Sequence, residues 1–186
     1  PAGLKAEISY MGKIVNLPWG YHPTIVFYNK KLIGSLGLTA PNRIAEFEAL
    51  ADKIKATGVY PLSSGDSGLW RTSYVLELLI PSFSGPDFYQ ELMTMEAEWG
   101  DTRARPAYDY WKRWVEKKYW YPDMRSRRWA EGLTLFVNKE AAMYFLGTYG
   151  SPMLKQAGWV LGQDFDAFLF PQENPKFSRT FTGPFD

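Results

Sequence analysis

Short apolar segments with strand character alternate with amphipathic segments of helical character along the 186 residues. The strand-like segments are residues 13–17, 24–28, 59–62, 141–146 and 165–170. The helix-like segments are residues 30–36, 41–57, 69–79, 88–95, 104–119, 129–136 and 148–157. Because a β-α alternation buries a sheet beneath helices, this order predicts an α/β domain with a short central sheet.

The helix predicted after Pro41 shows the periodicity on which this assignment depends. Its apolar residues recur at spacings of three and four, its charged residues occupy the other face, and Gly58 ends it. The helix predicted over residues 69–79 is expected to end at Pro81, which cannot donate a backbone hydrogen bond. Trp111 and Trp114 fall among apolar positions at helical spacing, so we assign them to the core.

Composition excludes several classes of function. The chain has 21 Lys and Arg against 20 Asp and Glu, so no net field favours nucleic acid. Cysteine is absent and His22 is the single histidine, which argues against a metal site or a metal cofactor. Asp164 and Asp166 are explained by solvent exposure or capping without calcium. The longest apolar stretches fall short of the roughly 20 residues of a membrane span.

Several local patterns recur together in one order. They are Gly12 to Trp19, Phe27-Tyr28-Asn29-Lys30-Lys31-Leu32, Leu36-Gly37-Leu38, Pro41 with Glu46-Phe47, Phe136, Ala141-Ala142-Met143, and Gly147-Thr148-Tyr149. In this order and spacing the chain resembles the extracellular solute-binding proteins of ABC importers, in particular the sugar-binding relatives of maltose-binding protein. Arg43, Ile44 and Lys139 differ from the residues that are common in this family at the corresponding positions. These are structural positions, so the differences say little about the ligand.

The resemblance implies an α/β fold of the type II periplasmic-binding-protein class, present here as one incomplete lobe. Residues 1–28 would form the hinge-proximal segment and a crossing strand, residues 29–177 the second lobe, and residues 178–186 the start of the return crossing. The family holds its ligand between two lobes and signals to a membrane permease. The chain would therefore come from an extracellular or periplasmic protein, with lipid anchoring left open and without a signal segment in this sequence.

Loops that line the cleft in this family supply the candidate ligand-binding residues. A sugar needs directed hydrogen bonds for its hydroxyls and aromatic planes for its ring faces. The candidates are Tyr149 as a stacking platform, Asp66 and Ser64 as hydrogen-bonding groups, and Trp70, Trp19 and Arg71. Asp66 is equally explained as a helix N-cap, Trp70 as a core residue, and Trp19 as part of an aromatic turn. No catalytic residue is assigned.

Three alternatives remain open from the sequence. An anionic solute, such as a glycerol phosphate, could use the Gly-rich loops before helices together with Arg71. A glycoside hydrolase would need a carboxylate pair, for which Glu91, Glu96, Glu98 and Asp101 are the candidates, although a solvated face explains them. An isolated fragment could bind nothing, because a cleft needs two walls, and its exposed surfaces would favour self-association.

Overall fold

The computed structural model describes residues 9–15, 22–63, 65–68 and 70–177, and only the backbone of Arg71 and Thr72. A four-stranded mixed sheet forms its centre, in the order β4-β5-β3-β6. The strands are β3 (Thr24–Asn29), β4 (Tyr60–Leu62), β5 (Ala141–Gly147) and β6 (Phe165–Phe168). β3 runs antiparallel to both β5 and β6, and β4 runs parallel to β5. The predicted α/β class is confirmed.

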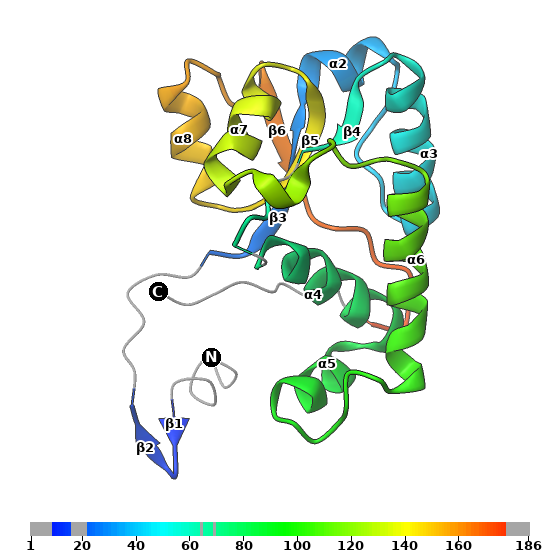
Figure 1. The fold of residues 1–186 in the computed structure, drawn as a ribbon, viewed down its shortest axis with the longest axis vertical. Coiled ribbons are helices and arrows are strands. Elements are labelled where there is room, and N and C mark those ends of the chain that lie inside the picture. The colour runs from blue at the N-terminus through cyan, green and yellow to red at the C-terminus, as the bar shows by residue number, and fades with distance from the viewer. Residues whose placement is uncertain (1–8, 16–21, 64, 69, 178–186) are drawn as a thin grey trace.

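Helices cover both faces of this sheet (Figure 1). The helices α3 and α6 lie on one side, α7 and α8 lie on the other, and α4 and α5 extend beyond one end of the strands. Their bounds are α2 (Lys30–Ser35), α3 (Ile44–Ala56), α4 (Arg71–Ser84), α5 (Pro86–Met93), α6 (Arg105–Glu116), α7 (Trp129–Val137) and α8 (Gly150–Gln156). Short 3-10 turns occur at Thr102–Ala104 and Met124–Ser126. A separate hairpin joins β1 (Ser9–Tyr10) to β2 (Lys13–Ile14).

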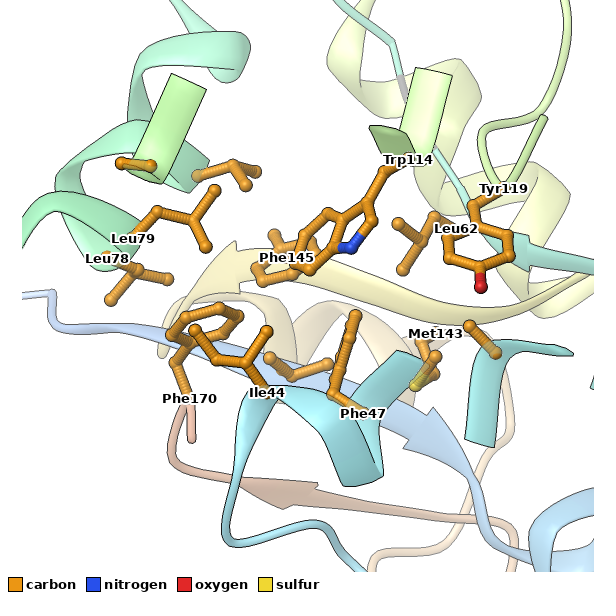
Figure 2. Packing of buried hydrophobic residues seen from close by; sticks show 14 of the residues in the cluster. Ile44, Phe47, Leu62, Leu78, Leu79, Trp114, Tyr119, Met143, Phe145 and Phe170 are labelled. Carbon is orange, nitrogen blue, oxygen red and sulfur yellow. The ribbon is translucent and has the colours of Figure 1, made fainter. Parts of the chain in front are cut away.

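The larger core lies between the sheet and the helices α3, α4 and α6, and aromatic rings fill its centre (Figure 2). Phe47 contacts Trp114 with ring centroids 5.0 Å apart, and it also contacts Phe145 and Phe170 at 6.0 and 5.9 Å. Trp114 is fully buried, as predicted, and its indole Nε1 donates to Glu48 Oε1 at 2.9 Å. A smaller core beneath α7 and α8 includes Phe27, Phe136, Leu146, Leu154 and Phe165.

β3 is an inner strand of the sheet rather than a strand outside the lobe. It pairs with β5 from Thr24 to Tyr28 and with β6 from Val26 to Asn29. The predicted boundary after Tyr28 therefore falls within β3, which has a paired neighbouring strand on each side. The division of the chain into hinge segments and a lobe stays a prediction.

The helix predicted to end at Pro81 continues to Ser84, so that prediction was wrong. Proline removes one backbone donor but does not prevent the next residues from staying helical when other contacts hold them. Gly85 N donates to the Pro81 carbonyl at 3.0 Å. The Ser82 hydroxyl donates to Pro171 O at 3.1 Å and accepts from Glu173 N at 2.8 Å, which ties the last turn of α4 to the segment after β6.

The two aspartates around Phe165 have local structural roles, as expected. Asp164 accepts a hydrogen bond from Val160 N at 2.9 Å and pairs with Lys31, and Asp166 pairs with Lys30 at 3.4 Å. The hydrogen bond with Lys31 and that with the Val160 amide lower the pKa of Asp164. Among the helices that the structure describes, none is both long and apolar enough to cross a membrane.

Candidate functional site

Three chain segments meet at one edge of the sheet because of the strand directions. β4 and β5 are parallel, so their carboxyl ends point to the same edge. β3 is antiparallel to β5 and begins there, with Thr24 opposite Gly147. In α/β sheets ligands bind outside the carboxyl ends of strands. The loop after β4, the turn after β5 and His22 before β3 therefore form the candidate ligand site.

The loop after β4 is fixed by backbone hydrogen bonds to the segment that leads into α7. Asp66 N donates to Met124 O at 2.8 Å, and Ser67 N donates to Arg127 O at 2.9 Å. The Ser63 hydroxyl donates to Gly132 O at 2.6 Å. These bonds tie Ser63, Asp66 and Ser67 to the segment around α7, and such fixed backbone favours a preorganised binding site.

Gly65 allows this close approach. A Cβ at residue 65 would lie 2.7 Å from the carbonyl carbon of Arg128, nearer than real Cβ atoms come to backbone. The glycine is therefore required by the packing of two loops against each other.

Asp66 is buried in this loop, with 3% of its surface exposed. α4 begins at Arg71 and its N-cap position is Trp70, so the alternative interpretation of Asp66 as the cap of α4 was wrong. A carboxylate buried to this extent must be hydrogen bonded, which fixes its orientation. The structure therefore places a buried, oriented carboxylate, and not the cap of α4, in the loop after β4.

Tyr149, in the turn after β5, contacts two other aromatic rings. Its ring meets His22 edge-on, with centroids 5.4 Å apart and an interplanar angle of 87°. It meets Trp129 in the same way at 6.1 Å and 83°. The backbone carbonyl of Trp129 accepts a hydrogen bond from the Tyr144 hydroxyl at 2.7 Å, which links the start of α7 to β5. Tyr149 is thus supported from two sides.

Trp70 is exposed rather than part of the core. Its side chain is 38% exposed and meets Tyr74 with ring centroids 5.2 Å apart. The core interpretation of Trp70 was therefore wrong, and an aromatic plane remains accessible at the start of α4. Asp66, Trp70 and Tyr149 all follow the carboxyl ends of two neighbouring parallel strands.

Three of the predicted site residues cannot be placed in this geometry. Ser64 and Trp19 lie outside the described residues, and only the backbone of Arg71 is described, at the first position of α4. Trp129 was missed by the sequence reasoning. Its only signal was its position at the start of a predicted helix.

Comparison with known proteins agrees with this architecture. The bacterial extracellular solute-binding protein family matches residues 1–181. The chain belongs to this family. The resemblance inferred from the sequence is thereby confirmed.

Individual relatives of this solute-binding protein are only moderately similar in sequence. It is 28% identical over 153 residues to an uncharacterized ABC transporter extracellular-binding protein of Pyrococcus horikoshii, covering 81% of this chain and 34% of the relative. It is 27% identical over 174 residues to a probable sugar-binding periplasmic protein of Mesorhizobium japonicum, covering 92% and 41%. The chain thus spans well under half the length of these relatives.

Solved structures show the same fold. The bacterial solute receptor AcbH superposes with a TM-score of 0.78 at 28% identity, covering 90% of this chain and 42% of the receptor. It is described as having an exclusive substrate preference for β-D-galactopyranose. A chitin oligosaccharide binding protein superposes with a TM-score of 0.82 at 24% identity, covering 92% and 43%, and at that identity it supports the fold alone.

Two of the four carboxylates considered for glycoside cleavage, Glu91 and Asp101, have a structural partner in this solute-binding protein. Arg103 pairs with Glu91 at 2.8 Å and with Asp101 at 2.8 Å, and its guanidinium lies 4.1 Å from the centroid of the Phe88 ring. Hydrogen bonds with Arg103 lower the pKa of Asp101. An acid for glycoside cleavage needs the opposite shift. Within the described ranges, no group of three or more His, Cys, Asp or Glu could hold a metal ion.

Proposed function

We propose that this chain supplies one wall of the ligand-binding cleft in the solute-binding component of an ABC importer, and that the ligand is a carbohydrate or a related polyol. Tyr149, with Trp129 and His22 beside it, provides the stacking surface. Asp66 provides a hydrogen-bonding group, and Trp70 provides a second aromatic surface. The remaining wall would come from the other lobe of the full-length protein.

The observation that carries this proposal is the meeting of aromatic and carboxylate groups at one edge of the sheet. Sugar hydroxyls need hydrogen-bond partners with fixed directions, and sugar rings present apolar faces that pack on aromatic planes. Tyr149 is braced by two perpendicular rings. Asp66 is buried in a loop held by backbone bonds. Such preorganised polar and aromatic groups are typical of small-molecule sites.

The names of the relatives support the same ligand class. The curated relatives include probable sugar-binding periplasmic proteins, and AcbH is described as a galactopyranose receptor. From these similarities we propose a location outside the cytoplasmic membrane and a permease of the ABC type as the protein partner. The alternative of an anionic solute depends on the side chain of Arg71, which lies outside the described part of the structure. The titration below therefore includes phosphorylated solutes.

Calorimetric titration of the full-length protein tests the proposal. The panel should contain neutral mono- and oligosaccharides, polyols and glycerol phosphates. We expect a neutral saccharide to bind, and Tyr149→Ala to weaken its affinity about tenfold or more, equivalent to at least about 1.4 kcal/mol. Tyr108→Ala is the matched control, because that tyrosine lies on α6 and its hydroxyl donates to Trp99 O.

Each result of the titration has a distinct meaning. Binding confined to phosphorylated solutes would replace the sugar proposal with the anionic alternative. A wild-type protein that binds no member of the panel would contradict the carbohydrate assignment. Equal losses for Tyr149→Ala and Tyr108→Ala would indicate a general effect on folding and would remove Tyr149 from the site.

A further inference from the structure

One face of α4 runs away from the candidate site and does not serve the core. Trp70, Tyr74 and Glu77 are spaced by four and three residues, so they share this face. Val75 and Leu79, which are 1% and 0% exposed, lie on the face toward the core. At a rise of about 1.5 Å per residue, the seven residues from Trp70 to Glu77 extend the face by about 10 Å along the helix.

Glu77 is an unusual residue at this position. Its side chain is half-buried, and among the described side chains no Lys or Arg forms an ion pair with it. Burial raises the pKa of Glu77, and a hydrogen bond with Ser73 opposes this shift only in part. A desolvated carboxyl reduces the stability of a fold at neutral pH, where it is ionised. Such a group beside a ligand site is a candidate for a functional role.

Pro81 lies inside α4, four residues after Glu77, and is buried. Because proline has no N–H, the backbone carbonyl of Glu77 does not receive the usual helical hydrogen bond from residue 81, and the buried proline ring lies beside it. The carboxyl is therefore the group of Glu77 that we consider as an acceptor for a ligand. A carboxylate accepts hydrogen bonds from a donor and does not suit an anion.

We infer that Glu77 is a specificity-determining residue of the ligand site, where it binds a hydroxyl or ammonium donor on a second sugar unit of an oligosaccharide. The first unit would contact Tyr149 and Trp70, and the chain of sugars would follow α4 past Tyr74. This inference rests on the proposed function. It adds that the ligand is longer than a monosaccharide and is neutral or amino-bearing at its second unit.

Calorimetry on the full-length protein tests the inference with three disaccharides of matched linkage: a neutral one, one with a 2-amino group and one with a uronic acid as second unit. The corresponding monosaccharide is the reference ligand. The variants are Glu77→Ala and Glu77→Gln. Glu116→Gln is the matched control, because Glu116 lies on the exposed face of α6 and pairs with Lys112 at 3.7 Å.

For Glu77→Ala we expect an affinity loss of about tenfold or more for the neutral and amino disaccharides, with monosaccharide affinity unchanged within about twofold. Glu77→Gln should keep binding of the neutral disaccharide but lose any preference for the amino sugar, because an amide accepts a hydrogen bond but carries no charge. Discrimination against the uronic acid should fall in the same variant. Glu116→Gln should leave all four affinities unchanged.

Two results would overturn the inference. Equal losses for monosaccharide and disaccharides in Glu77→Ala would show that Glu77 acts through the fold, and unchanged affinities would show that it does not meet the ligand. In both cases the Tyr149 experiment could still succeed, so the proposed function would stand. A wild-type protein that binds no saccharide would instead contradict the proposed function and this inference with it.

Discussion

Gly147 leaves the space that the ring of Tyr149 occupies: a Cβ at residue 147 would lie 2.7 Å from Cδ1 of that ring. Real Cβ atoms do not approach neighbouring atoms so closely. The last residue of β5 and the aromatic residue two positions later are therefore coupled. The position of the proposed stacking surface therefore depends on the absence of a side chain at residue 147 as well as on the tyrosine itself.

The variant Gly147→Ala should consequently weaken saccharide binding while leaving most of the fold intact. The added methyl group would push the Tyr149 ring away from His22 and Trp129, against which it is now braced. We expect an affinity loss of about tenfold by calorimetry in the full-length protein, since small displacements at a preorganised site are costly. Near-UV circular dichroism should report the ring movement.

Gly150 provides the control for this variant. A Cβ there would lie 2.5 Å from Cδ2 of Leu146 and 3.0 Å from Cε2 of Phe27, inside the smaller core. Gly150→Ala should lower the melting temperature through overpacking, which typically costs about 1–3 kcal/mol. Its saccharide affinity should stay close to that of the wild type. A larger affinity loss in Gly150→Ala than in Gly147→Ala would contradict the coupling of Gly147 to Tyr149.

Much of the architecture was predictable because buried faces of helices and strands require apolar residues at regular spacings in the sequence. Five apolar residues of α3 recur at helical spacing, and all five are buried: Ile44, Phe47, Leu50, Ala51 and Ile54. β5 is a continuous apolar run that is buried along its length, as expected for an inner strand. Tyr149 was predicted as a site residue because α/β folds generally present ligand groups at the ends of strands, and this assignment stays a prediction.

Other features depend on contacts between distant segments and leave no local signal. Pro81 predicted the end of a helix, but hydrogen bonds from the segment after β6 keep the next turn helical. Trp70 looked like a core residue because an exposed indole is uncommon beside an apolar helix. Trp129 reaches Tyr149 only because α7 packs against β5, which no periodicity indicates.

A second variant tests the packing of the two loops at the site. Gly65→Ala would place a methyl group against the backbone carbonyl of Arg128, which cannot move as a flexible side chain can. We expect a loss of stability of about 1–3 kcal/mol and a weaker saccharide affinity, since Asp66 would shift with the loop. Chemical denaturation and calorimetry measure the two effects. A stable Gly65→Ala variant with normal affinity would contradict the close approach of the loops.

The hydroxyl of Tyr119 should contribute measurably to stability. The ring is fully buried, and the hydroxyl donates to Asp52 Oδ1 at 2.6 Å and accepts from Lys117 Nζ at 2.9 Å. Burial, followed by the hydrogen bond to Asp52, raises the pKa of Tyr119 to about 12. Tyr119→Phe should cost about 1–2 kcal/mol in urea unfolding at neutral pH.

Tyr121→Phe is the matched control for that measurement. The Tyr121 hydroxyl donates to Glu140 Oε2 at 2.9 Å, but this pair is exposed to solvent. Exposed hydrogen bonds exchange readily with water, so its loss should cost only a few tenths of a kcal/mol. Similar costs for the two variants would show that burial adds nothing to the Tyr119 hydrogen bond.

The pH dependence of stability provides a test of Glu77 that needs no ligand. Burial raises the pKa of Glu77 above its ordinary value of 4.5, so the folded state binds this proton more tightly than the unfolded state. The stabilising effect of the bound proton is fully present below pH 4.5 and is lost as the pH rises through the raised pKa. At neutral pH the ionised, desolvated carboxyl therefore lowers the free energy of unfolding.

The amide in Glu77→Gln does not ionise, so the stability of this variant should not fall in this way as the pH rises. We expect its free energy of unfolding, relative to that of the wild type, to increase between pH 4.5 and neutral pH, as measured by urea denaturation across this range. Glu116→Gln, at an exposed position, should show no such increase. A carboxyl that lowers the free energy of unfolding at neutral pH does not serve stability there, which is consistent with the binding role that we infer for Glu77. Loss of stability in Glu77→Gln at neutral pH would show the opposite.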